Sequence, residues 1–154
     1  MSQDYQLIDV KRPVDWEDYH DIRRKVLFEA RGNFSYDAHH PDEFNPRNQP
    51  LLLKLNEVAI GTVRLDQLYE DIAAIRLVAI RPEHQRRGHG RVLAAMVEER
   101  ARAQKVTTLL VNAAREAVGY YESLGYEPYA FDPSELTGIA SECVQMRKQL
   151  LSPD

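Results

Sequence analysis

The segment from residue 72 to residue 111 constrains the fold most strongly, because its hydrophobic period changes twice. Ile72–Ile80 is an apolar run of strand length, and Val106–Val111 is rich in leucine and β-branched residues, as in a buried strand. Between them, Arg91–Gln104 has apolar residues at helical spacing with charged residues opposite. A strand, an amphipathic helix and a second strand predict a crossover between parallel neighbours. A ligand site is expected where the helix leaves the first strand.

The remaining apolar runs predict a largely antiparallel sheet around this crossover. Asn56 and Glu57 separate two of these runs and indicate a short hairpin. A helix over Ala114–Leu124 is expected to end at Gly125. The other predicted strands are Tyr5–Val10, Leu51–Leu55, Val58–Leu65, Tyr126–Phe131 and Ile139–Arg147. This pattern predicts an α+β (mixed α/β) fold in one domain over residues 1–154, without internal repeats.

The N-terminal third is expected to hold one helix and one long loop. Pro13 ends the first strand, and Asp15 is placed to cap a helix that starts at Trp16. Residues 31–50 contain one glycine and three prolines, so we predict a surface loop with at most one helical turn. The helix is expected to bury an apolar stripe made of Trp16, Tyr19, Ile22, Val26, Leu27 and Phe28. The opposite side is expected to carry Arg23, Arg24 and Lys25.

Composition and charge exclude several classes of protein. With 44% apolar and 29% charged residues, the 154-residue chain is neither disordered nor fibrous. Its longest apolar run, Val92–Val97, is far shorter than the roughly 20 residues of a membrane span. Met1–Tyr5 lacks the pattern of a secretory signal, and a lone Cys143 fits a reducing compartment, so we expect a cytoplasmic protein. A net charge of −4 makes nucleic acid an improbable partner, and the crowded His39–Asp42 segment does not predict a metal site.

The loop before the amphipathic helix carries the strongest chemical signal. Gly88 and Gly90 leave backbone N–H groups accessible at the positive end of the helix dipole, which suits an anion. Arg86, Arg87 and Arg91 add guanidinium groups that suit phosphate. The loop lacks the Gly-Lys-Ser/Thr of a P-loop and the third glycine of a dinucleotide fingerprint, so ATP and NAD are disfavoured. A pyrophosphate cradle is predicted, and a purely structural turn is the alternative.

These residues resemble the signature of the GNAT-type N-acetyltransferases. The family's strand, Gln/Arg-x-x-Gly-x-Gly/Ala loop and helix are matched by Gln85–Gly90 after Leu77–Pro82. Asn112, Ala117 and Tyr120–Tyr126 are similar to a second family segment, which ends in aromatic-Tyr-Glu-x-x-Gly-aromatic. The resemblance covers roughly residues 50 to 131 and implies about seven strands, about four helices and a splayed parallel pair at the cofactor site.

The resemblance also implies an acetyl-CoA site and its residues. By position, the backbone of Val78, Ala79 and Ile80 would pair with the pantetheine amides, as in β-augmentation. Asn112 would contact the pantetheine arm or a structural water, or else cap the next helix. The pyrophosphate would be held by the backbone of Arg86, Arg87, Gly88, His89, Gly90 and Arg91.

Catalysis by resemblance would be acetyl transfer to an amine by direct attack in a ternary complex. Tyr121 matches the family's tyrosine near the thioester sulfur, where a phenol can protonate the leaving thiolate. Tyr120 is interpreted as its packing neighbour, and a backbone N–H such as that of Ile80 would stabilise the oxyanion. The Ile72–Ile80 strand holds no acid, so the general base stays open among Glu29, Asp66, Asp71, His39, His40 and His84.

The acceptor stays open at the level of the sequence. The acidic net charge allows cationic amines such as polyamines, aminoglycosides or peptide lysines, whereas Arg64 and Arg76 would favour an amine with a carboxylate unless they pair within the protein. By family analogy, the Gly32–Pro50 loop would set this specificity, and a homodimer could form through the edge of the closing strands. The alternatives are a catalytically silent CoA-binding or regulatory module of the same fold, and a different phosphate-bearing ligand.

Overall fold

A sheet of seven strands is the frame on which the other elements pack. The computed structural model describes residues 3–150 of the chain. The strand order is β1-β2-β3-β4-β5-β7-β6, and every neighbouring pair is antiparallel except β4 and β5. The strands are β1 (Tyr5–Asp9), β2 (Asn48–Leu55), β3 (Val58–Gln67), β4 (Ile72–Ile80), β5 (Thr108–Ala113), β6 (Glu127–Pro128) and β7 (Val144–Gln149). The predicted fold class, the hairpin and the parallel crossover are confirmed.

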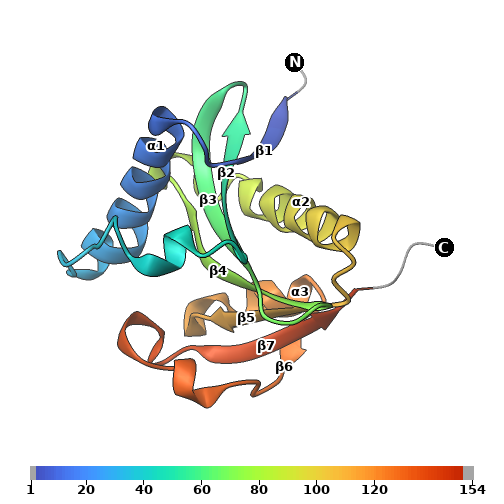
Figure 1. Ribbon diagram of the computed structural model, residues 1–154. Coiled ribbons are helices and arrows are strands. Elements are labelled where there is room, and N and C mark those ends of the chain that lie inside the picture. Colours follow the sequence, from blue (N-terminus) through green and yellow to red (C-terminus); the bar gives the residue numbers. More distant parts are fainter. Residues whose placement is uncertain (1–2, 151–154) are drawn as a thin grey trace.

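Helices cover both faces of the sheet. Figure 1 shows α1 (Pro13–Arg23) on one side and α2 (His89–Ala103) on the other, with α3 (Val118–Ser123) after β5. Successive side chains of β2 point to opposite faces of the sheet. Leu52 packs on the face covered by α1, whereas Leu51 and Leu53 pack on the face covered by α2. The described residues contain three α-helices where about four were expected, with short 3₁₀ turns in the connections. None of these helices combines the length and apolar character needed to cross a membrane.

The start of α1 differs from the prediction. The helix begins at Pro13 with Arg12 as its N-cap, so Asp15 is the third helical residue and not the cap before Trp16. Asp15 accepts a hydrogen bond from the backbone N–H of Arg12 at 3.3 Å, which completes a capping box. The fixed φ of proline suits the first helical position, where an N–H would have no partner in the helix.

Arg23 was expected on the solvent side of this helix and is instead buried. It lies four residues after the buried Tyr19, so helical spacing places both side chains on one face. Burial is tolerated because its guanidinium pairs with the buried carboxylate of Glu43. The chain continues from α1 as a π-helical turn, η1 (Arg24–Phe28), and a 3₁₀ turn, η2 (Glu29–Arg31).

The two closing strands are shorter than predicted. β6 contains two residues, and the segment from 138 to 140 forms a 3₁₀ turn, η7 (Gly138–Ala140), before β7 begins at Val144. Pro128 and Pro133 lack the N–H that would continue the ladder, and Gly138 has a φ of 59°, which does not fit a strand. The predicted loop over residues 31–50 is confirmed in part: it contains one 3₁₀ turn, η3 (Pro41–Phe44), but β2 already begins at Asn48.

Candidate functional site

The parallel strands β4 and β5 separate before β4 ends. Their pairing runs from Ile72 opposite Thr108 to Ile75 opposite Val111, whereas β4 continues to Ile80. We call the edge of residues 76–80 that faces away from β3 the open edge of β4. It begins at a β-bulge, because the register with β3 shifts between its pairs with Thr62 and Arg64 and Leu77 has a φ of 51°. The sequence does not mark where the pairing ends.

Backbone groups of β4 face this open edge. The N–H of Arg81 bonds the carbonyl of Ile60 at 2.8 Å, so the alternation of an antiparallel pair turns the backbone of Ile80 away from β3. The Ile80 carbonyl accepts a hydrogen bond from Nε2 of Gln85 at 2.9 Å, which agrees with this direction. By the same alternation Ala79 bonds toward β3. Of the predicted strand residues, Ile80 thus presents its backbone to the open edge more directly than Ala79 does.

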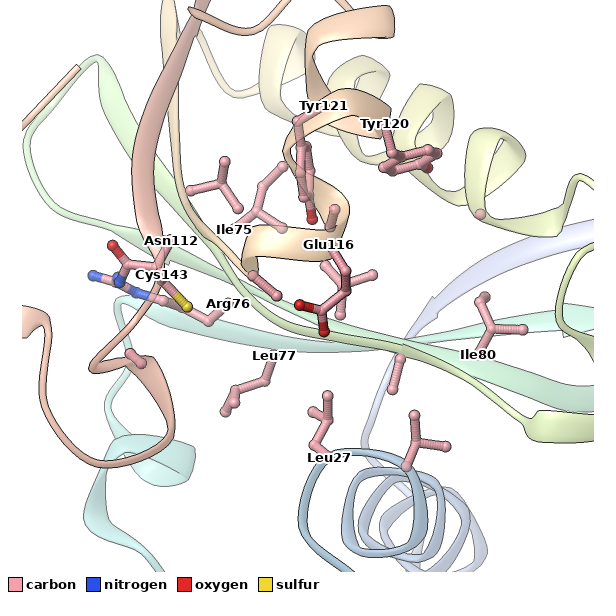
Figure 2. Close-up of a pocket in the computed structure, with 18 of the residues that line it drawn as sticks. Leu27, Ile75, Arg76, Leu77, Ile80, Asn112, Glu116, Tyr120, Tyr121 and Cys143 are labelled. Carbon is pink, nitrogen blue, oxygen red and sulfur yellow. The ribbon is translucent and has the colours of Figure 1, made fainter. Parts of the chain in front are cut away.

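A cavity of about 480 Å³ lies along the open edge. Figure 2 shows Tyr120 and Tyr121 above β4, and Leu27 of η1 on the opposite side. The lining residues come from η1, η2, β3, β4, the loop before α2 and the start of α2, the end of β5, the turn at residues 114–117, α3 and the segment before β7. They are Val26, Leu27, Arg31, Arg64, Ile75, Arg76, Leu77, Val78, Ala79, Ile80, Gln85, Gly90, Val111, Asn112, Ala114, Glu116, Ala117, Tyr120, Tyr121, Ala140 and Cys143.

The predicted anion loop lies at the α2 end of this cavity. Arg86 and Gly88 have φ values of 63° and 86°, and Gly88 is the N-cap of α2 without a capping side chain. The first backbone N–H groups of a 15-residue helix are therefore not covered by a side chain. Arg86, Arg87 and Arg91 are all exposed, and Arg91 also donates to the hydroxyl of Ser123 at 3.1 Å. The geometry suits an anion at Gly88, with these arginines as accessible cations.

His89 is in this loop, and its side chain packs inside the protein. It is buried, and its Nδ1 shares a hydrogen bond of 2.7 Å with the hydroxyl of Tyr5 in β1. Its ring also packs edge-on against Tyr5 and His84. Burial, followed by the nearby His84 and Arg87, lowers the pKa of His89 below its usual value. The side chain thus anchors the loop to β1, and its backbone remains at the helix start.

We expect the lowered pKa of His89 to make the protein less stable in mild acid. A folded-state pKa below the unfolded value of about 6.5 means that stability is fully present above that pH and is lost as the pH falls through the folded pKa. The loss is at most about 1.4 kcal/mol per pH unit for each histidine. Burial also lowers the pKa of His20, which therefore acts in the same direction.

Thermal unfolding between pH 7.5 and pH 5 measures this effect. His89→Asn, which keeps an acceptor near the position of Nδ1 without titrating, should reduce the pH dependence. An identical pH dependence in His89→Asn and the wild type would show that the anchor does not titrate in this range.

Tyr121 points its hydroxyl into the cavity. The side chain is nearly buried, and its ring packs edge-on against Tyr120 and Tyr126, each with centroids 5.3 Å away. Burial raises the pKa of Tyr121 well above its usual value, so the phenol is protonated at neutral pH. Within residues 3–150 its hydroxyl has no hydrogen-bond partner. Tyr121 can therefore donate a proton to a group inside the cavity.

Two of the three arginines that line the cavity are neutralised by buried or half-buried acids of the protein. Arg64 donates to Asp66 at 2.8 and 2.9 Å and to Glu43 at 3.1 Å. Arg76 donates to both oxygens of Glu135, at 2.5 and 3.1 Å. Because each guanidinium already has carboxylate partners, the structure supports internal pairing and not the recognition of a substrate carboxylate.

The amide of Asn112 belongs to the same network. Its Nδ2 donates to Glu135 at 3.2 Å, and its Oδ1 accepts from Nε2 of Gln145 at 3.0 Å. The helical cap considered for Asn112 is wrong, because α3 starts later and its N-cap is Ala117. Asn112 lines the cavity, so contact with a ligand there stays a prediction.

Comparison with known proteins agrees with this geometry. The model of the acetyltransferase (GNAT) family matches residues 16–126, which is more than half of the chain. The chain belongs to the GNAT acetyltransferase family. A Lactobacillus plantarum protein assigned as an N-acetyltransferase is 26% identical, with a TM-score of 0.80 over 96% of this chain and 99% of that one.

Two further solved structures share the GNAT fold and contain coenzyme A. The PaiA N-acetyltransferase of Thermoplasma acidophilum, in complex with coenzyme A, is 14% identical, with a TM-score of 0.70 over 97% of this chain and 100% of that one. The N-acetylglutamate synthase of Neisseria gonorrhoeae, complexed with coenzyme A and N-acetyl-glutamate, is 15% identical, with a TM-score of 0.72 over 96% of this chain and 35% of that one.

In this GNAT protein part of the predicted site lines one cavity. Tyr121 and Asn112 line it together with Val78, Ala79, Ile80 and Gly90, whereas the other predicted loop residues, Arg86, Arg87, Gly88, His89 and Arg91, flank Gly90 in sequence without lining the cavity, and their contact with a cofactor stays a prediction. The six candidate bases, in contrast, are all absent from the lining. Sequence reasoning missed Glu116, the carboxylate that does line the cavity, although its position between the motif residues Asn112 and Tyr121 was an available signal.

Metal chemistry is not indicated at this site. Within residues 3–150, no three side chains of His, Cys, Asp or Glu gather in a way that could hold a metal ion. The expectation that no metal is used stays a prediction.

Proposed function

We propose that this chain transfers the acetyl group of acetyl-CoA to an amine by direct attack in a ternary complex. The observation that carries the proposal is the open edge of β4 beside a cavity that ends at an uncapped helix N-terminus. The outward backbone groups of Ile80 can pair with an extended amide-bearing chain, as an added strand does. The N–H groups after Gly88, with Arg86 and Arg87, suit the pyrophosphate at the other end of such a ligand.

The Tyr121 side chain and the backbone N–H of Ile80 then each have a defined part in the reaction. Acetyl-CoA supplies an activated acyl group as a thioester. The acceptor ammonium loses one proton, its nitrogen bonds to the thioester carbonyl carbon, and the carbon–sulfur bond breaks. Tyr121 donates a proton to the leaving thiolate and regains one from the nitrogen, which must lose a second proton to become an amide. The outward N–H of Ile80 is the candidate for stabilising the carbonyl oxygen.

We expect calorimetric titration to show micromolar binding of acetyl-CoA and CoA, and much weaker binding of ATP and NAD. Replacing Gly88 and Gly90 together by valine should weaken acetyl-CoA binding at least about tenfold, a loss of about 1.4 kcal/mol. A side chain at Gly88 is strained at its φ of 86°, and a Cβ at Gly90 would lie 3.3 Å from the Tyr120 hydroxyl.

A matched double variant controls for strain. Gly32 also has a positive φ, and Gly119, like Gly90, is helical, and both lie outside the cavity with open space around them. Gly32→Val with Gly119→Val should destabilise the fold comparably but retain acetyl-CoA affinity. Absence of acetyl-CoA binding to the wild type would overturn the proposed function.

A further inference from the structure

Glu116 is the one carboxylate among the residues that line the cavity, and its one ion pair within the described residues is a weak, solvated one. It lies in the 3₁₀ turn η5 (Arg115–Ala117) between β5 and α3, and Figure 2 shows its carboxylate directed into the cavity. Its ion-pair partner is Arg31, whose Nη2 lies 3.6 Å from Oε1 in a pair that is mostly solvated. Among residues 3–150, no side chain or backbone N–H donates a hydrogen bond to the Glu116 carboxylate. By contrast, Glu43 accepts from Arg64 at 3.1 Å and Glu135 accepts from Arg76 at 2.5 Å.

The other acidic groups near the cavity are already paired. Asp66 binds both nitrogens of the Arg64 fork, and Glu135 binds Arg76. An ammonium group entering the cavity therefore meets one carboxylate that it can bind without breaking a hydrogen-bonded ion pair. Displacing Arg31 costs little, because an exposed ion pair of this kind is worth at most about 1 kcal/mol.

The surroundings of Glu116 restrict what else the acceptor can carry. Leu27 and Leu77 lie across from it (Figure 2), and Val26 and Ala140 also line the cavity. Burial raises the pKa of the Cys143 thiol, which is therefore neutral there. An apolar chain fits these walls. A carboxylate on the carbon next to the amine would instead lie close to the Glu116 carboxylate and would compete with it for Arg31, because the other lining arginines, Arg64 and Arg76, already bind acids of the protein.

We propose that the acceptor is a primary amine with an apolar chain and no carboxylate next to its nitrogen, and that Glu116 binds its ammonium group and takes its first proton. This inference rests on the proposed acetyl transfer and assigns the base that the sequence left open. Glu116 passes that proton to solvent at the exposed mouth of the cavity, while the second amine proton leaves with the thiolate through Tyr121.

Matched pairs of acceptors test the substrate class. Phenethylamine with phenylalanine, tyramine with tyrosine, and isoamylamine with leucine differ only by the α-carboxylate. The loss of thioester absorbance from acetyl-CoA measures turnover without a thiol reagent, which would also react with Cys143. We expect kcat/KM for each amine to exceed that for its amino acid at least about tenfold. Faster turnover of the amino acids, or turnover of none of the amines, would overturn the proposed class.

Substitution of Glu116 tests its role. Glu116→Gln should lower kcat/KM for the best amine about a hundredfold at pH 7. The deficit should shrink as the pH approaches the amine's own pKa near 10, because the free amine needs no base. Glu116→Asp, which keeps a carboxylate, should retain more activity, and the exposed Glu122→Gln should match the wild type. A purely structural role would give a deficit independent of pH.

Acetyl-CoA titration of the same variants separates the two proposals. If Glu116→Gln binds acetyl-CoA and acetylates amines as the wild type does, the inference about Glu116 fails while the acetyl transfer stands. If the wild type itself binds no acetyl-CoA, the proposed function fails and the inference falls with it.

Discussion

Replacing Tyr121 by phenylalanine should lower kcat about a hundredfold or more while leaving acetyl-CoA affinity within about twofold. The substitution removes only the hydroxyl, which faces the cavity, and keeps the ring that packs against Tyr120 and Tyr126. Without a donor, the thiolate must leave unprotonated or take its proton from water. Steady-state turnover with the best amine, together with calorimetric titration of acetyl-CoA, measures both quantities on one preparation.

Tyr126→Phe is the matched control for this experiment. Tyr126 is buried beside Tyr121, and burial raises its pKa in the same way, but it does not line the cavity. Its hydroxyl should therefore be dispensable for turnover. Equal activity of Tyr121→Phe and the wild type would remove Tyr121 as the proton donor, and a parallel loss of acetyl-CoA affinity would assign it a binding role.

The same measurements address the silent-module alternative. A CoA-binding module of this fold would bind acetyl-CoA in both the wild type and Tyr121→Phe and would acetylate no amine in either. The raised pKa of Tyr121 adds a further expectation for an enzyme. The phenol keeps its proton in alkaline solution, so any loss of turnover below about pH 10 should come from another group.

Much of the frame of this site could be predicted from local patterns. The change of hydrophobic period between residues 72 and 111 identified β4, α2 and β5 and their parallel crossover. Gly88 and Gly90 located the start of α2 within a residue or two, because a helix N-terminus without side chains has a short sequence signature. The motif around Tyr121 identified a side chain that does line the cavity.

The parts that local patterns missed depend on contacts between distant residues. The charged Arg76 follows Ile75, where pairing with β5 ends, but one charged residue inside a strand does not show that pairing stops there, and the positive φ of Leu77 has no sequence signal. Arg76 and Glu135 are 59 residues apart, so the sequence around one does not predict its ion pair with the other. The charge of Arg23 suggested the solvent side of α1. Its burial depends instead on helical spacing and on Glu43, its ion-pair partner in the loop.

That partner, Glu43, is the centre of a buried network that reaches the cavity through Arg64. It accepts hydrogen bonds from the Tyr19 hydroxyl at 3.0 Å and from Arg64 at 3.1 Å, and it also pairs with Arg23. Burial alone would raise the pKa of Glu43, but Arg23, Arg64 and Tyr19 outweigh it and hold the pKa below its usual value. Glu43 is therefore ionised at neutral pH and balances two buried cations.

Glu43→Gln should lower the free energy of unfolding by about 3 kcal/mol at pH 7, because it leaves buried guanidinium charge without its partner. Within the described part of the chain, Glu43 is the carboxylate that pairs with Arg23, whose buried Nε already lacks a hydrogen-bond partner. Thermal unfolding should show a fall in Tm of about 6–12 °C.

The neighbouring Asp42→Asn is the matched control for that variant. Asp42 is exposed and lies 3.9 Å from Arg64, so its loss should change stability by no more than about 0.5 kcal/mol. Equal stability of the two variants would show that the network is no stronger than a surface ion pair.

Because Arg64 lines the cavity, a destabilised Glu43→Gln protein should also bind its amine more weakly. Its acetyl-CoA affinity should be retained, since the predicted cofactor loop lies at the α2 end of the cavity. That split would show that η3 supports the acceptor side of the site through Glu43.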